Sequence, residues 1–134
     1  MTDLSRSTIG QLLIPVTDLD RAIPWYRDVL GLPFLFSAPP QMAFFQCGDV
    51  RLLVGVPEAA ESRRGSGTIY FHVEDIRAVH ATLAGRGVAF EAPPHAVHRT
   101  ERSTLWLSEF RDPDGNPLAL MAEVPVAPPG GGLP

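Results

Sequence analysis

The chain has 134 residues, and its 11 Lys and Arg against 15 Asp and Glu give a net charge of −4. This charge disfavours an extended basic surface, so we expect no nucleic-acid partner. Apolar residues make up 45% of the sequence and charged residues 19%. That balance is typical of a chain that buries a core, and the length limits it to one compact domain.

The absence of targeting signals and the single cysteine indicate the cellular compartment and the possible metal ligands. No apolar run approaches the ~20 residues that a membrane helix needs, and the first residues lack the basic start and apolar centre of a signal peptide. We therefore expect a cytoplasmic protein without a membrane partner. Cys47 is the single cysteine, which excludes an internal disulfide and a Cys-rich zinc site, so His and carboxylate side chains remain as candidate metal ligands.

The distribution of Pro, Gly and polar residues predicts the domain organisation. We expect an N-terminal arm over residues 1–8 and a single domain over 9–124, followed by a disordered Pro/Gly tail over 125–134. Within the domain, the polar stretch 58–67 is interpreted as a linker between a first module, 9–57, and a second, 68–124.

The first module begins with a β-rich run over 9–16, and Asp18 follows as a helix N-cap. We expect this helix to end at Leu30 and Gly31. Pro24 lies inside it and lacks the amide that would bond back to residue 20. The opening turn is therefore predicted to be loose or 3₁₀-like, with the regular helix over 25–30.

The second module repeats this order. A strand is predicted over 68–73, and Asp75 is the helix N-cap. Ile76, Val79, His80 and Leu83 then lie on one helical face. Three short β segments follow each helix, at 34–36, 42–46 and 50–56 and at 88–91, 105–110 and 118–123. The sequence thus predicts an α+β fold of two tandem βαβββ modules, with a tight turn over Asp112–Asn116 between the last two strands.

The run Val16-Thr-Asp-Leu-Asp-Arg-Ala-Ile-Pro-Trp-Tyr-Arg-Asp-Val-Leu-Gly-Leu32 and the later run Phe110-Arg-Asp-Pro-Asp-Gly-Asn-Pro-Leu-Ala-Leu120 resemble the vicinal oxygen chelate superfamily. It includes glyoxalase I, bleomycin-resistance proteins and extradiol dioxygenases. The resemblance implies that the two modules form a cup-shaped mixed sheet. It also implies small-molecule chemistry or binding of several unrelated kinds on one architecture.

In that superfamily His, Gln or Glu side chains facing the cup hold a divalent metal. The matching positions in this chain are Gln11, Thr68, Ala119 and either Leu52 or Leu53, depending on strand register. Gln11 is the only retained family ligand, and a metal needs three or four converging donors. We therefore predict no metal ligand set and no cofactor, and regard a divalent metal as disfavoured. His72 and Glu123 share the predicted face but lie ~13 Å farther along their strands than the abandoned positions.

Strand alternation predicts which side chains line the cup. They are Gln11, Leu13, Thr68, Tyr70, His72, Ala119, Met121 and Glu123. Trp106 or its neighbours Leu105 and Leu107 are expected to close one side, which would give a small-molecule pocket of apolar walls with a few polar groups. Tyr70 and Trp106 are equally compatible with filling the core. The polar segment 92–103, with His95 and His98, is interpreted as either a lid or solvated surface.

The preferred function is binding of a hydrophobic or aromatic small molecule at a degenerate metal site, as in bleomycin-resistance proteins. The resemblance further implies a homodimer. The alternative is a glyoxalase-like lyase or isomerase, or a dioxygenase, with relocated metal ligands. That alternative also includes metal-free acid/base catalysis by His72, His95 or Glu123. Whether the chain is an enzyme is left open by the sequence.

Overall fold

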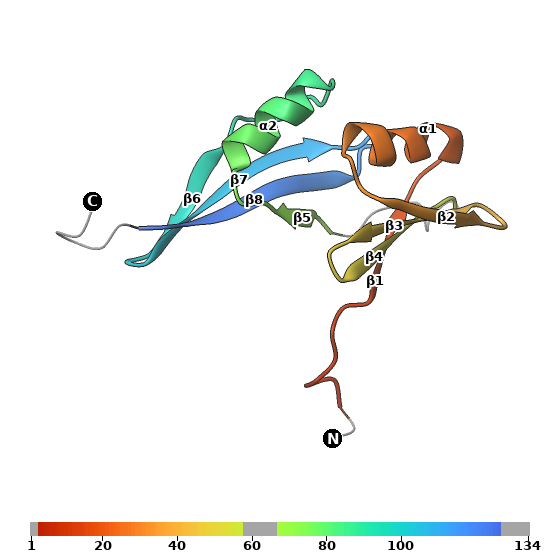
Figure 1. Cartoon of the computed structure of the whole chain (residues 1–134), viewed down its shortest axis with the longest axis horizontal. Helices are drawn as coiled ribbons and strands as arrows, with labels where there is room; N and C mark the ends of the chain where they lie inside the picture. The colour runs from red at the N-terminus through yellow and green to blue at the C-terminus, as the bar shows by residue number, and fades with distance from the viewer. Residues whose placement is uncertain (1–2, 58–66, 127–134) are drawn as a thin grey trace. The chain divides into compact units, whose positions relative to one another are not determined.

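The computed structural model describes residues 3–57 and 67–126 (Figure 1). The chain divides into two compact units, with the boundary between Ser66 and Gly67, which we call unit 1 and unit 2. Both units have the element order βαβββ, so the predicted pair of modules is confirmed. The described part of the expected N-terminal arm is exposed to solvent. The expected linker, 58–67, lies outside the described residues except for Gly67.

Unit 1 is a four-stranded sheet with one helical segment on one face. Its elements are β1 (Gln11–Pro15), α1 (Leu19–Pro24), β2 (Phe34–Ala38), β3 (Met42–Cys47) and β4 (Val50–Gly55). The strand order is β1-β4-β3-β2, in which β1 runs parallel to β4 and the other neighbours are antiparallel. The two short connections, β2–β3 and β3–β4, favour antiparallel pairing, and the helical crossover permits the parallel pair.

The helical segment of unit 1 departs from the sequence prediction. Asp18 is the N-cap, as expected, and its carboxylate accepts a hydrogen bond from the Asp20 amide at 2.9 Å. The regular α-helix is α1, which ends at Pro24, whereas Trp25–Val29 form a π-helical turn in which the Leu30 amide donates to the Trp25 carbonyl at 3.0 Å. The Arg21 and Ala22 amides both donate to the Asp18 carbonyl, so the first turn closes without the donor that Pro24 lacks.

The core of unit 1 lies between its helical segment and the sheet. Tyr26 and Phe45 are both fully buried, and their ring centroids lie 5.9 Å apart. Ile14, Leu52 and Val54 are buried on the same face of the sheet. Burial of these side chains explains why the sheet keeps one register, because a slip of one residue would turn all of them to solvent.

Unit 2 has the same plan. Its elements are β5 (Ile69–His72), α2 (Ile76–Gly85), β6 (His95–Arg99), β7 (Ser103–Arg111) and β8 (Pro117–Pro125), in the strand order β5-β8-β7-β6. Asp75 is the N-cap of α2 and accepts a hydrogen bond from the Ala78 amide at 3.0 Å. Ile76 and Leu83 are the buried residues of α2. No helix in residues 3–57 and 67–126 is long and apolar enough to cross a membrane.

One prediction for the strands of unit 2 was wrong. The segment expected at 88–91 contributes an isolated bridge between Phe90 and Phe110, and the full strand is β6, within the stretch interpreted as a lid or solvated surface. Pro93 and Pro94 explain the break, because proline cannot donate to the β ladder. The segment is the edge of the sheet, and residues 96–99 are exposed, which agrees with the solvated-surface alternative and not with a lid.

The last strand extends beyond its predicted end. Pro125 pairs with Ser103, and the Val126 amide donates to the Arg102 carbonyl at 2.7 Å. The first two residues of the stretch expected to be a disordered tail, 125–134, therefore belong to or adjoin the sheet. Residues 127–134 lie outside the described part of the chain.

The turn between β7 and β8 is the one predicted from the sequence. Asp112 is only 5% exposed, and its Oδ1 accepts hydrogen bonds from the Asp114 and Asn116 amides at 2.9 and 2.8 Å. Its Oδ2 accepts from Asn116 Nδ2 at 2.7 Å. Gly115 has a φ of 85°, a conformation that favours glycine.

The substitution Asp112→Ala is expected to lower the free energy of unfolding by about 3 kcal/mol, because three hydrogen bonds to a buried carboxylate are lost. Urea denaturation followed by circular dichroism measures this change. Glu101→Ala, at an exposed position, is the control and should change the value by no more than about 0.5 kcal/mol. Equal stability of the two variants would contradict the structural role of Asp112.

Candidate ligand-binding faces

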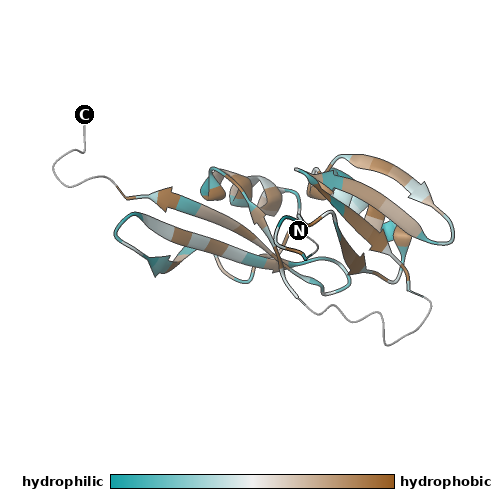
Figure 2. Cartoon of the chain, turned by 90° about the horizontal axis from the view of Figure 1, so that it is seen from below, coloured by the Kyte–Doolittle hydropathy of each residue, from teal (hydrophilic) through white to brown (hydrophobic). Residues whose placement is uncertain are grey.

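Each sheet has one face covered by its helix and one face turned away from it, which we call the open face. In unit 1 the register places three apolar side chains side by side on the open face: Leu13 pairs with Leu53, which pairs with Phe44. Leu13 is 58% exposed. Figure 2 shows from below that the strands of both units carry many hydrophobic residues. Exposed apolar surface of this kind marks a binding surface more often than a scattered residue does.

Gln11, the retained family ligand position, lies at one end of the unit 1 open face. Its register partner is Arg51, and Arg51 Nε donates a hydrogen bond to Gln11 Oε1 at 3.1 Å. The register also shows which leucine corresponds to the family ligand position on β4. Leu53 shares the open face, whereas Leu52 is buried on the helix-covered face.

On the unit 2 open face, Tyr70 pairs with Ala119 and His72 with Met121. Glu123 follows two residues later on β8 and pairs with Leu105. These residues share one face, as the alternation predicted. Tyr70 is 50% exposed, and Ala119 is fully buried because its methyl group lies between larger side chains on the adjoining strands. Thr68 is exposed and immediately precedes β5.

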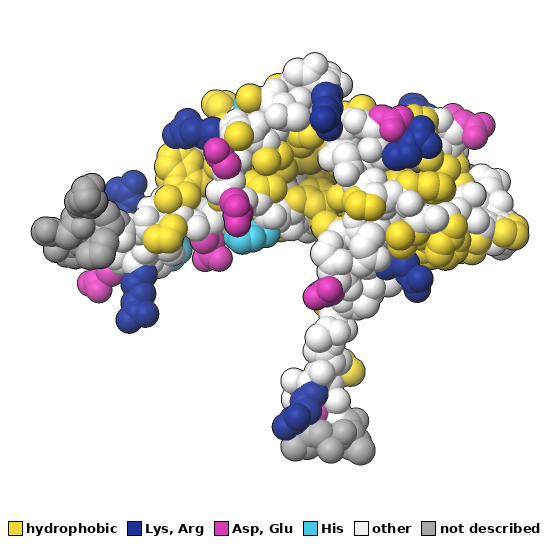
Figure 3. Space-filling model, in the orientation of Figure 1, with side chains coloured by type: hydrophobic (Ala, Val, Ile, Leu, Met, Phe, Trp, Pro, Cys, Tyr) yellow, Lys and Arg dark blue, Asp and Glu magenta, His cyan; other side chains and the backbone are white. Residues whose placement is uncertain are grey.

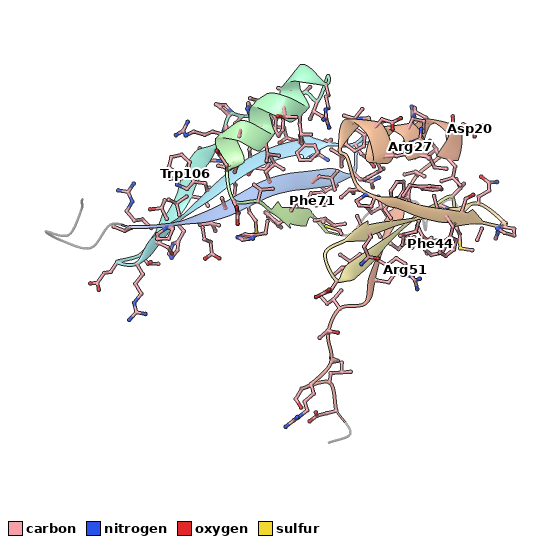
Figure 4. The ribbon with its side chains drawn as sticks, viewed as in Figure 1. Asp20, Arg27, Phe44, Arg51, Phe71 and Trp106 are labelled. Carbon is pink, nitrogen blue, oxygen red and sulfur yellow. The ribbon has the colours of Figure 1, made fainter. Side chains whose placement is uncertain are left out.

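Trp106 does not share this face, which corrects the prediction that it closes the cup. It pairs with Ala122, on the face covered by α2, and the guanidinium carbon of Arg77 lies 5.1 Å from its ring centroid. Figure 4 shows Trp106 near α2. Leu105 and Leu107, the other two residues considered for this role, are on the open face, since Leu107 pairs with Met121. The sequence did not fix the face because the pairing register of β7 was unknown.

His95 and a residue that the sequence analysis did not single out form a polar pair on the unit 2 open face. His95 Nε2 lies 3.6 Å from Glu109 Oε1, and His95 Nδ1 lies 2.9 Å from the Pro93 carbonyl oxygen. Nδ1 is therefore the donor to that carbonyl, and Nε2 faces the carboxylate. Glu109 pairs with Ala119, which pairs with Tyr70, so the pair belongs to the same face as the predicted lining residues.

The donor atoms of these faces do not form a recognisable metal centre. Leu53 and Ala119 occupy two of the four family ligand positions and offer no donor side-chain atom. Within residues 3–57 and 67–126, no three His, Cys, Asp or Glu side chains are grouped so that they could hold a metal ion. A stable site for Zn²⁺ or a similar ion needs three or four such donors, so the residues at the family positions do not fit the metal.

Sequence reasoning also missed an aromatic and basic cluster on the unit 1 open face, formed by Phe36, Phe44 and Arg51. The Phe36 and Phe44 rings are stacked, with centroids 4.6 Å apart and planes inclined by 29°. The Arg51 guanidinium carbon lies 5.3 Å from the Phe44 centroid. Figure 4 shows Phe44 and Arg51 below the β3–β4 ribbons, on the side away from α1. Apolar side chains gather over this part of the molecule, with basic atoms beside them (Figure 3).

Comparison with known proteins places this geometry in a family. The model of the Glyoxalase/Bleomycin resistance protein/Dioxygenase superfamily matches residues 8–120. The chain belongs to this superfamily. It is also 30% identical over 121 residues to the uncharacterized protein YraH of Bacillus subtilis strain 168, an alignment that covers 79% of the chain and 91% of YraH.

Solved structures of the superfamily have the same fold. Lactoylglutathione lyase from Agrobacterium tumefaciens is 26% identical, with a TM-score of 0.71 over 87% of this chain and 93% of the lyase. TnmS3, an antibiotic-binding protein from Streptomyces sp. CB03234, is 24% identical, with a TM-score of 0.72 over 90% of this chain and 99% of TnmS3. One fold thus serves a lyase and a binding protein, so membership alone does not choose between catalysis and binding.

Cys47, at the end of β3, gives a prediction that depends on pH. Burial raises the pKa of its thiol, so the reactive thiolate is scarcer in the folded chain than in the unfolded chain at pH 8. Alkylation by iodoacetamide should therefore be slower in the native protein than in urea. The difference should shrink as the pH rises through the native pKa of the thiol. Mass spectrometry measures both rates, and equal rates at pH 8 would contradict the prediction.

Proposed function

We propose that this protein binds a hydrophobic or aromatic small molecule on its open sheet faces and does so without a metal. The observation that carries the proposal is the hydrogen bond from Arg51 to Gln11. It places a permanent cation beside Gln11, the one family ligand that the chain retains. The guanidinium would repel a metal ion, and it already uses the amide oxygen that would have to coordinate the ion.

Each unit has its own proposed contacts on its own open face. In unit 1 they are Gln11 and Leu13, and in unit 2 they are Thr68, Tyr70, His72, Ala119 and Met121. Apolar walls with a few polar groups are the usual composition of small-molecule sites. The antibiotic-binding protein TnmS3 supports the proposal because it serves a binding function on the same fold. The resemblance to the family further leads us to propose a homodimer. Light scattering, which measures the molar mass in solution, tests this.

Acid/base catalysis without a metal is the second candidate function, and the contact between His95 and Glu109 favours it. Because Nδ1 donates to the Pro93 carbonyl and Nε2 faces the Glu109 carboxylate, the imidazole and the carboxylate could share a proton between them, as an acid/base pair does. His72 and Glu123 are the other candidate acid/base groups on the same open face. Both are exposed, so a bound substrate would have to exclude water from them for either group to act efficiently.

The first prediction of the proposal concerns metal. Protein washed with chelator should contain well under one metal ion per chain by elemental analysis. Its melting temperature should not change when Zn²⁺, Ni²⁺, Mn²⁺ or Fe²⁺ is restored, because a ligand that binds only the folded state raises that temperature. A stoichiometric metal, or a clear rise on restoration, would favour the metal-dependent enzyme instead.

The second prediction concerns the face of unit 2 that contacts the ligand. A panel of aromatic compounds, screened by ligand-observed NMR against chelator-washed protein, should yield binders. Tyr70→Ala is expected to weaken their binding about tenfold, through loss of an aromatic contact on the open face. Trp106→Ala, on the opposite face, is the matched control and should leave binding unchanged. Loss of binding in the control alone would contradict the assignment of the open face.

A further inference from the structure

We infer that the open face of unit 1 selects planar aromatic anions, whose ring stacks on Phe36 and whose acidic group pairs with Arg51. This inference rests on the proposed function and specifies the chemical class of the ligand. It concerns the cluster of Phe36, Phe44 and Arg51, of which the sequence analysis singled out no member.

Phe36 and Phe44 form the aromatic part of the cluster. The register pairs Phe36 with Phe44 across β2 and β3, after a bulge in β2 that separates this pair from the pair of Phe34 and the buried Phe45. Phe44 is 9% exposed, whereas Phe36 is 46% exposed. Phe44 thus supports the Phe36 ring from within the protein and leaves much of Phe36 open to solvent. A planar ring can stack there in the offset geometry that aromatic groups prefer.

Arg51 supplies the positive charge of the cluster. Arg51 is exposed, and its Nε is held by Gln11. Among the described residues no carboxylate forms an ion pair with Arg51, whereas Arg27 pairs with Asp28 and Arg111 with Glu91. The two terminal nitrogens of Arg51 therefore have donors to offer. Because Nε is anchored and the planar group lies over Phe44, the guanidinium is oriented before a ligand arrives. A guanidinium binds a carboxylate through two parallel hydrogen bonds.

The separation of Phe36 and Arg51 sets the size of a ligand that can contact both. Phe36 lies on β2 and Arg51 on β4, with β3 between them. The Phe36 and Phe44 ring centroids lie 4.6 Å apart and the Arg51 guanidinium carbon lies 5.3 Å from the Phe44 centroid, so the Phe36 ring and the guanidinium are at most about 10 Å apart. A ligand that contacts both groups is therefore close to the length of a fused bicyclic ring with an acidic substituent. A single small ring would reach only one of the two groups. The cluster therefore favours a bicyclic aromatic carboxylate over benzoate.

The probe is 2-naphthoate, titrated into the full-length protein by isothermal calorimetry. Its neutral analogue 2-naphthamide has the same rings, and octanoate has the charge without a ring. Naphthoate should bind more tightly than either compound. Arg51→Met, which keeps most of the apolar stem, should weaken naphthoate about tenfold and leave naphthamide unchanged, since it removes a charge-assisted hydrogen bond. Arg51→Lys should restore part of the loss.

Phe36→Leu should weaken naphthoate and naphthamide by the same factor, because it removes the stacking ring and leaves the charge in place. The matched control is Arg77→Met, which removes the other arginine that lies over an aromatic ring, in unit 2. It should not alter naphthoate binding. Circular dichroism and the melting temperature of each variant verify that the fold is retained.

The inference is overturned if naphthoate and naphthamide bind equally, or if Arg51→Met leaves naphthoate binding unchanged. It is also overturned if naphthoate fails to bind up to about 1 mM. In each case, binding of other members of the aromatic panel would leave the proposed function standing. If no member of the panel binds, both proposals fail.

Discussion

The candidate site depends on the alternation of side chains along a β-strand. Neighbouring residues of a strand point to opposite faces of the sheet, so every four-stranded sheet has two surfaces to cover. Each unit of this chain contains one helical segment, which covers one of them. In unit 1 the helix-covered face holds Tyr26 and Phe45, and the other face presents Leu13 and Phe36 to solvent. The cost of exposing these apolar groups is small in comparison with the buried core, and it leaves them available to a ligand.

Much of the fold could be predicted because its signals are local. Asp18 and Asp75 are N-caps in the structure, as the sequence indicated. The turn at Asp112 combines an acceptor, a proline and a glycine within five residues. The errors in the helix and strand boundaries occurred next to prolines, because a proline can lie at either end of a helix or strand. The helix is regular up to Pro24 and π-helical after it, the reverse of the prediction, and the strand expected before Pro93 and Pro94 begins after them.

Less of the site could be predicted, because it depends on pairing between distant strands. Alternation within one strand correctly grouped Tyr70 with His72, but the face of Trp106 required the register of β7 against β8. The contact between Gln11 and Arg51 joins residues forty positions apart. Nothing in the neighbourhood of Arg51 in the sequence indicates that its guanidinium reaches Gln11. Glu109 was missed for the same reason, since its partner His95 lies on another strand.

The turn at Asp112 has a consequence for the order in which unit 2 assembles. It joins β7 and β8, the two longest strands, into a hairpin whose contacts are close in sequence. The parallel pairing of β5 with β8 instead closes a loop that includes α2, β6 and β7. Loop-closure entropy makes the hairpin the cheaper structure to form first. Folding of unit 2 should therefore nucleate at β7–β8. The strand β5, with Tyr70 and His72, should pair with β8 only after that hairpin has formed.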